Sequence, residues 1–271
     1  MSFLLEPLTY QFMQRGLLAS VIVGVLCAVM GTYVVLRGMA FLGDAMAHAI
    51  LPGVAIAYIF KGDLLIGAGV AAIAVALIIG LFSKGGAVKE DTAIGIMFAA
   101  ALSLGVALIS TMQTYAVDLS HILFGNVLGV SPSDLWLIGG LSFAILLTVG
   151  LLFKPFLVIS FDPVLAATLR LPAELLRNLM LVLLALTVVV SLQTVGVSLA
   201  AAMLVTPAAT AYLLTRRLLP MMMVSALIGA LSSIIGLYLS YYFNIVSGSA
   251  IVLTATMFFM LAFLWKRFRG T

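Results

Sequence analysis

Long apolar runs follow one another along this chain, separated by short polar or charged breaks. A helix that crosses a bilayer needs about 20 predominantly apolar residues. Nine segments meet that length: 16–36, 41–60, 64–82, 92–112, 133–153, 175–193, 196–215, 220–243 and 248–265. The pattern predicts an all-α fold, a polytopic membrane helix bundle that forms a single domain over residues 1–271. Eight spans are the alternative, if 41–60 is re-entrant or two short spans merge.

Composition supports the membrane class. Hydrophobic residues make up 65% of the chain and charged residues 8%, whereas soluble domains are roughly 45–50% apolar and about 25% charged. The single cysteine, Cys27, lies in an apolar run and supports neither a disulfide framework nor a thiolate metal cluster. The amino terminus has no basic start and no small-residue cleavage site, so we expect no signal peptide.

Basic residues predict the orientation. If the carboxyl terminus is cytoplasmic and there are nine spans, all of the 13 Lys and Arg residues except Arg15 and Lys61 lie on the inside. Cytoplasmic loops carry an excess of Lys and Arg. The distribution therefore favours a cytoplasmic carboxyl terminus and an external amino terminus.

The internal loop 154–174 contains an amphipathic pattern. Three apolar residues share one helical face: Phe161, Leu165 and Leu169. Asp162 or Ser160 is a candidate cap for the start of this short helix. Two interpretations are open, a helix that lies among lipid headgroups and a lever that docks another protein.

Asp44 is the only acidic residue well inside a predicted span, and His48 is the only such histidine. Residues four apart lie on one helix face, with Cβ atoms roughly 5–6 Å apart, a spacing that suits one divalent cation held by a carboxylate and an imidazole. Counted from Arg37 at about 1.5 Å per residue, the two lie roughly 10 and 16 Å along the axis. His48 is then near the midplane of a core about 30 Å thick. The alternative is a structural pair, although intramembrane ionisable residues usually mark function.

Two prolines predict helix breaks. Pro52 lacks an N–H and leaves the carbonyl of residue 48 without its helical partner, and Pro207 does the same for residue 203. Broken helices at mid-membrane often line a pathway; a simple packing kink is the other interpretation for Pro207.

His121, in the predicted external loop 113–132, is expected to be a surface residue. The chain lacks a P-loop, a nucleophile elbow and a zincin motif, so an enzyme is not expected.

The stretch LRGMAFLGDAMAHAILPGVAIAYIF, 36–60, closely resembles the signature of the membrane permeases of metal-ion ABC transporters, which import manganese, zinc or iron. Two more stretches are similar to this family, ILFGNVLGVSPSDL at 122–135 and LQTVGVSLAAAMLVTPAATAYLLT at 192–215. The resemblance runs in order along about the whole chain. The first motif is the specific one.

The resemblance implies a homodimeric permease in the plasma (inner) membrane of a bacterium, bound to two ATP-binding subunits and supplied by an external metal-binding protein. It implies that Asp44 and His48 are the translocation-site ligands and that the chain carries no cofactor, with ATP bound by the partner subunit. The transported metal would be Mn²⁺, Zn²⁺ or Fe²⁺, and the Leu-Pro-Gly after the histidine favours manganese-type members over zinc-type ones.

The resemblance also implies that the internal loop is the coupling helix, with Phe161, Asp162, Leu165, Leu169 and Arg170 as its contacts with the ATPase. The family usually has glycine where this chain has Arg170, which leaves the exact coupling contacts open. Two functions of other classes compete with the ABC importer. One is an ATP-independent secondary cation carrier that uses the same Asp–His pair, and the other is a structural scaffold, which leaves the buried acid unexplained.

Overall fold

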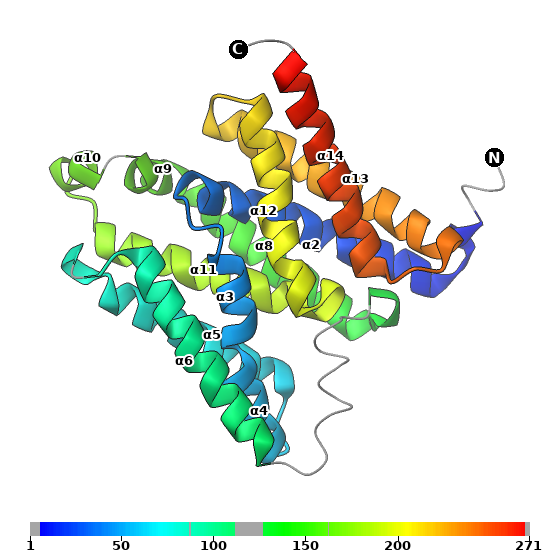
Figure 1. Ribbon diagram of the computed structural model, residues 1–271, viewed down its shortest axis with the longest axis horizontal. Helices are drawn as coiled ribbons and strands as arrows, with labels where there is room; N and C mark the ends of the chain where they lie inside the picture. The colour runs from blue at the N-terminus through cyan, green and yellow to red at the C-terminus, as the bar shows by residue number, and fades with distance from the viewer. Residues whose placement is uncertain (1–5, 87, 112–126, 162, 269–271) are drawn as a thin grey trace.

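The computed structural model describes residues 6–86, 88–111, 127–161 and 163–268, and within these ranges every regular element is a helix. In chain order they are η1 (Pro7–Thr9), α2 (Gln11–Leu36), α3 (Leu42–Ala49), α4 (Leu51–Ile59), α5 (Leu64–Phe82), η2 (Lys84–Gly86), α6 (Glu90–Ser110), η3 (Val127–Gly129), α8 (Pro132–Leu151), α9 (Phe153–Phe161), α10 (Pro163–Thr168), α11 (Ala173–Val195), α12 (Val197–Leu214), α13 (Leu218–Phe243) and α14 (Ser247–Phe268). Figure 1 shows them as one bundle. The predicted all-α membrane bundle is confirmed.

In the described ranges, eight helical segments are long and apolar enough to cross a membrane. Helices α3 and α4 together make one of them, 42–59. The one predicted span outside these eight segments is 196–215, which coincides with α12. Its apolar part, 200–214, is a helix shorter than the eight spanning segments. Each of the nine predicted segments is therefore mainly helical within the described ranges.

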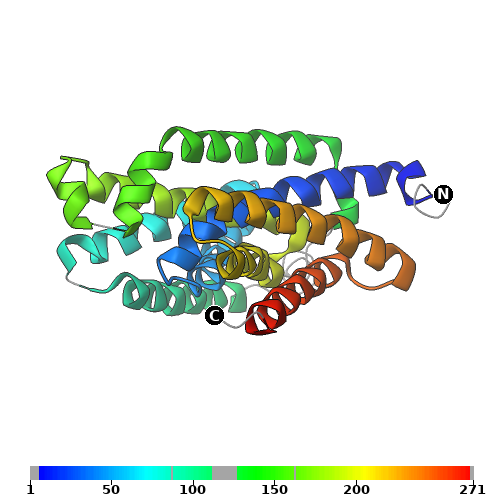
Figure 2. The ribbon, with the colours of Figure 1, turned by 90° about the horizontal axis from the view of Figure 1, so that it is seen from above.

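Helix α2 lies at the centre of the bundle. It packs against α13, α12, α8 and α11, and 72% of its most apolar window is buried, against 22% for α6 and for α8. Figure 2 shows α8 along one edge of the bundle and α14 toward the opposite edge. Because the outer helices are nearly as apolar as the central one, their exposed faces suit lipid rather than water.

Small residues allow the central helices to approach closely. The facing residues include Ser20, Gly24 and Ala28 on α2, and Ser225, Gly229 and Ser233 on α13. A Cβ atom on Gly24 would lie 2.8 Å from the Gly229 carbonyl oxygen, and the Ser225 hydroxyl donates to the Ala28 carbonyl at 2.8 Å. Spans in lipid associate through such close backbone contacts and interhelical hydrogen bonds.

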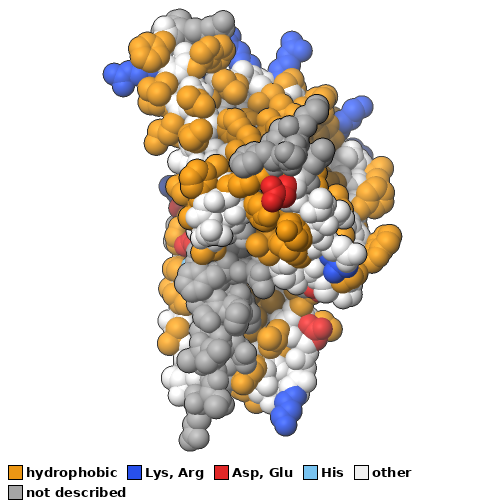
Figure 3. All heavy atoms as spheres, turned by 90° about the vertical axis from the view of Figure 1, so that its right-hand side faces the viewer, with side chains coloured by type: hydrophobic (Ala, Val, Ile, Leu, Met, Phe, Trp, Pro, Cys, Tyr) orange, Lys and Arg blue, Asp and Glu red, His pale blue; other side chains and the backbone are white. Residues whose placement is uncertain are grey.

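Charged side chains lie mainly at the ends of the helices. Figure 3 shows hydrophobic side chains over much of one face, with Lys and Arg toward its edges. The helix ends at 37, 84–89, 170–177, 216–217 and 266–267 carry most of the basic residues. The positive-inside rule assigns that end of the bundle to the cytoplasm.

Candidate functional site: an acid and an imidazole on one short helix

Helix α3 presents only two side chains to its open face. Asp44 and His48 lie one turn apart, and their side chains are 42% and 26% exposed. The other six residues of the helix are all buried: Leu42, Gly43, Ala45, Met46, Ala47 and Ala49. They pack chiefly against α12 and α6. The accessible surface of α3 therefore consists of a carboxylate and an imidazole.

The two polar groups lie close enough to act together. The Nδ1 atom of His48 is 3.6 Å from Oδ1 of Asp44 and 2.9 Å from the backbone carbonyl oxygen of Asp44. A neutral imidazole protonated at Nδ1 donates to that carbonyl and keeps the Nε2 lone pair available for a ligand. Metal-binding histidines commonly donate their other ring N–H to a backbone carbonyl, which fixes the orientation of the ring.

An aromatic side chain from another helix restrains the ring of His48. Phe98 of α6 meets the imidazole edge to face, with ring centroids 5.6 Å apart and an interplanar angle of 89°. The same Phe98 ring makes a T-shaped contact with Phe41, just before α3, at 5.3 Å. The sequence contains no signal for this contact, because Phe98 is one of 16 phenylalanines and lies in an apolar run.

The helix is interrupted shortly after His48. Helix α3 ends at Ala49 and α4 begins at Leu51, with Pro52 in its first turn. Pro52 has no N–H to offer to the His48 carbonyl. The His48 carbonyl therefore loses its regular helical partner, as the sequence predicts.

Pro207 behaves differently. Helix α12 runs through it without interruption, and the proline lies inside the helix, so the break predicted at Pro207 is wrong. The break in this part of the chain comes at Gly196, between α11 and α12, where φ is 84° and ψ is 168°. Prolines are tolerated inside membrane helices because neighbouring groups satisfy the freed backbone atoms.

The predicted coupling segment is two short helices, α9 and α10, rather than one. Its apolar face is open, with Phe161, Leu165 and Leu169 each 45–61% exposed. Asp162 lies outside the described residues, as does His121. The Ser160 hydroxyl donates to the Phe156 carbonyl within α9 at 2.7 Å, so its predicted role as a helix cap is wrong.

Arg170 occupies a backbone position that favours glycine. Its φ is 54°, in the left-handed region, and the N–H of Leu171 donates to the Ala166 carbonyl at 3.0 Å. This six-to-one hydrogen bond defines a Schellman motif, in which the left-handed residue is usually glycine. The geometry explains why a glycine suits this place and why an arginine there is strained.

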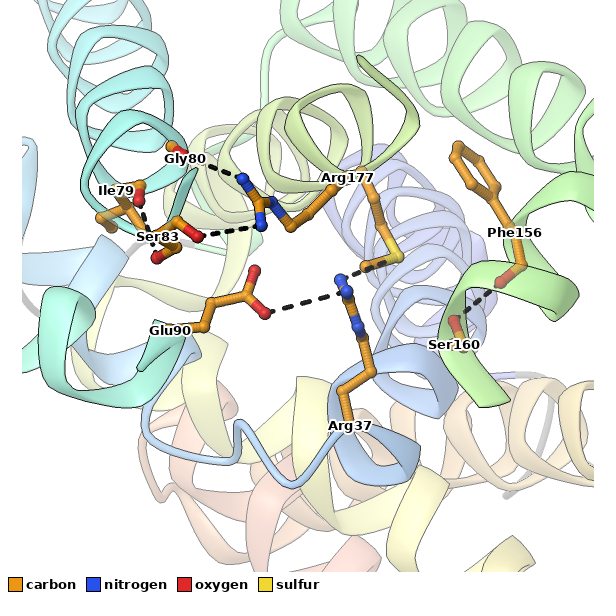
Figure 4. Close-up of polar contacts among 9 residues, drawn as sticks. Arg37, Ile79, Gly80, Ser83, Glu90, Phe156, Ser160 and Arg177 are labelled. Carbon is orange, nitrogen blue, oxygen red and sulfur yellow. Dashed lines mark hydrogen bonds and ion pairs between the residues drawn. The ribbon is translucent and has the colours of Figure 1, made fainter. Parts of the chain in front are cut away.

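A cluster of charged residues lies beside the connection that leads into α3. Nη2 of Arg37 is 3.8 Å from Oε2 of Glu90, and Arg177 donates to the carbonyls of Gly80 and Ser83 at 3.0 and 3.2 Å. Figure 4 shows the Glu90 carboxylate between the guanidinium groups of Arg37 and Arg177. The cluster holds the ends of α2, α5, α6 and α11 together. Its member Arg37 lies five residues before the start of α3.

The charges of the cluster do not balance, because it holds two cations and one anion. Burial lowers the pKa of Arg37, Glu90 opposes that shift, and Arg177 adds to it. Within the described part of the chain, Oε1 of Glu90 and Nε of Arg177 are buried and make no hydrogen bond. Sequence reasoning missed this cluster, because its members are separated by more than fifty residues and each resembles an ordinary charge at a helix end.

The described residues of one chain do not make up a complete metal site. Among the described residues, no group of three or more His, Cys, Asp or Glu side chains is placed to hold a metal ion. Asp44 and His48 offer two protein ligands, which leaves most positions around a six-coordinate divalent ion open. A metal ion held by this pair would need further ligands, from a second copy, from backbone carbonyl oxygens or from water.

Comparison with known proteins gives the family. The model of the ABC 3 transport family matches residues 9–266. The chain belongs to this family. The manganese transport system membrane protein MntC of Halalkalibacterium halodurans is 46% identical over 265 residues, which cover 98% of this chain and 91% of that protein. A probable iron transport system membrane protein of Haemophilus influenzae is 40% identical over 267 residues, 98% of each chain.

A solved structure supports the same fold for this ABC 3 family chain. PsaBC from Streptococcus pneumoniae, in complex with Fab, superposes with a TM-score of 0.84 at 42% identity, covering 97% of this chain and 94% of that one. The helical bundle and the bacterial relatives identify the chain as a multi-pass protein of the bacterial plasma membrane.

Proposed function

We propose that this chain is the permease subunit of an ABC importer for a divalent transition metal, with manganese as the favoured substrate and zinc or iron as alternatives. The observation that carries the proposal is the open face of α3, which consists of Asp44 and His48 alone. An acid exposed in a membrane bundle is unfavourable by at least about 2.5–3.5 kcal/mol on insertion scales, and a passing cation offsets that penalty.

We propose that two copies form the pathway. A two-fold homodimer that brings the α3 helices together would supply two carboxylates and two imidazoles to one ion. Carboxylate oxygen suits manganese, whereas imidazole suits zinc and iron as well. The relatives named for manganese favour the first of these metals.

The energy for transport would come from outside the chain. Two ATP-binding subunits would bind and hydrolyse ATP and would contact the exposed face formed by Phe161, Leu165 and Leu169. Arg170, and Asp162 next to Phe161 in the sequence, would add polar contacts. An external metal-binding protein would deliver the ion. Closure of the ATP-binding subunits would move α9 and α10, and the break between α3 and α4 at Pro52 would let the ligand helix move separately from the outer half of its span.

The experiment measures manganese, zinc and iron accumulation in cells that carry the full complex. Asp44→Asn and His48→Ala should each lower uptake at least tenfold, because each removes one ligand from both copies. Asp91→Asn is the matched control, since Asp91 is an exposed acid at the start of α6, and it should keep uptake within twofold. Binding needs the neutral imidazole, so uptake should also weaken in acid.

Assembly with the ATP-binding subunit is checked by co-purification for every variant. Normal uptake by both ligand variants, in an assembled complex, would remove the site assignment. Uptake that continues without the ATP-binding subunit would instead identify an ATP-independent carrier.

A further inference from the structure

A basic cavity opens at the end of the bundle that the positive-inside rule assigns to the cytoplasm. It has a volume of about 680 Å³ and lies among the ends of α2, α12 and α14, the start of α13, and Phe161 of α9. Its charged lining residues are all cationic: Arg216, Arg217 and Lys266. Among the described lining residues there is no carboxylate to balance them.

The three cations are available for a ligand. In the described ranges, none of them takes part in an ion pair or a side-chain hydrogen bond. The start of α13 adds to the positive potential, because this 26-residue helix has no side-chain cap and no acidic residue in its first turn. Its first residue, Leu218, lines the cavity. Free N–H groups and the helix dipole at such an end favour an anion.

The remaining lining residues are mainly apolar, apart from Thr215 and the hydroxyl of Tyr212. Val35, Leu36 and Leu214 line the cavity at the ends of membrane helices. Tyr212, also in the lining, is 53% exposed, and Trp265 next to Lys266 is 50% exposed. Tyrosine and tryptophan gather where a span leaves the hydrocarbon.

We propose that this cavity binds the headgroup of an anionic phospholipid from the inner leaflet. The phosphate would lie against Arg216, Arg217 and Lys266, since guanidinium groups bind phosphate through paired hydrogen bonds. The acyl chains would follow the apolar wall at Leu36 and Leu214. Basic cavities between spans on the cytoplasmic side are suited to such headgroups. The lining has a cationic part and an apolar part. It favours a lipid over an acidic protein surface, because a lipid offers a phosphate to the first part and acyl chains to the second.

The test uses the full-length chain in neutral detergent, with phosphatidylglycerol or phosphatidylcholine added at equal mole fraction. Bound lipid is measured by native mass spectrometry, and the melting temperature is measured in parallel. We expect the wild-type chain to retain phosphatidylglycerol in preference to phosphatidylcholine. Each cation near an anionic lipid contributes about fivefold in affinity, so R216Q/R217Q should weaken phosphatidylglycerol binding about 25-fold.

The matched control removes the same charge elsewhere. R15Q/R267Q changes Arg15 at the other end of α2 and Arg267, which does not line the cavity, and it should keep affinity within about twofold. K266Q, a single change at an exposed residue of α14, should lower affinity about fivefold. It tests the proposal even if the double variant does not fold.

Three results would overturn the proposal. The first is equal retention of the two lipids by the wild-type chain. The second is full displacement of phosphatidylglycerol by millimolar inorganic phosphate, which would indicate a site for a free anion. The third is unchanged lipid binding by R216Q/R217Q together with loss of co-purification with the ATP-binding subunit, which would make the cavity a protein contact.

Discussion

Removal of Glu90 should destabilise the protein more than removal of its partner, Arg37. The two side chains are 3.8 Å apart and only 20% and 13% exposed. Without Glu90, the partly buried guanidinium groups of Arg37 and Arg177 face each other with no anion between them. Without Arg37, Glu90 still has Arg177 nearby. The asymmetry follows from a cluster that holds two cations and one anion.

The expected loss of stability depends on how deeply the ion pair of Arg37 and Glu90 is buried. Two unit charges 3.8 Å apart attract by about 4 kcal/mol at an effective dielectric constant near 20, and desolvation offsets most of that. Removing one partner of a fully buried pair lowers stability by about 3–5 kcal/mol, whereas exposed pairs contribute about 0.2–1 kcal/mol. For this intermediate burial we expect E90Q to lower the free energy of unfolding by about 2–3 kcal/mol and R37Q by about 1–2 kcal/mol.

Chemical unfolding in detergent measures the loss in free energy of unfolding for each single variant. The double variant R37Q/E90Q then gives the coupling energy between the two residues. The ion pair between Lys84 and Glu174 is the control, because its side chains are 62% and 53% exposed, and E174Q should change stability by less than about 0.5 kcal/mol. The reasoning fails if R37Q is as harmful as E90Q, or if the two changes are simply additive. Metal uptake by E90Q should fall as well, since the cluster anchors the connection that carries α3.

Two further changes test the backbone geometry. R170G should raise the free energy of unfolding by about 1 kcal/mol, because glycine adopts the left-handed φ of 54° without strain; thermal unfolding would show a higher midpoint, and an unchanged or lower one would contradict the Schellman assignment. G31V should reduce the yield of folded protein or lower stability by about 3 kcal/mol or more, since a Cβ at Gly31 would overlap the Leu204 carbonyl of α12. G69V, where a Cβ meets nothing within 4 Å, should be nearly neutral; equal damage by both would show that the close approach is not the cause.

The helical bundle could be predicted from the sequence, because apolar runs of membrane length have few other stable arrangements. Helix breaks were harder to predict. Pro52 falls at the start of α4, where its missing N–H matters little. Pro207 has the same chemistry, yet α12 continues through it. That helix is packed on both α2 and α3, and tertiary packing outweighs the local preference.

Within the site, local spacing could be predicted and long-range contacts could not. Asp44 and His48 are four residues apart, so helical geometry alone places them together. The contacts of Phe98 with His48 and of Glu90 with Arg37 join different helices, and neither residue differs in type from its neighbours in a way that marks a partner. The charges of the basic cavity were visible in the sequence as orientation signals, but their gathering around one cavity depends on how α12, α13 and α14 pack.

The small residues of α3 explain why its polar pair remains open. A Cβ atom on Gly43 would lie 3.2 Å from the Cα of Ala201 on α12, so that neighbour packs directly against the backbone of α3. Ala45, Ala47 and Ala49 are likewise fully covered. Because small residues at close range and the buried side chains of Leu42 and Met46 fill the covered side, α3 has little room to rotate about its axis without a clash. Packing on the covered side thus directs Asp44 and His48 to the uncovered side, which is the side that the proposed homodimer uses.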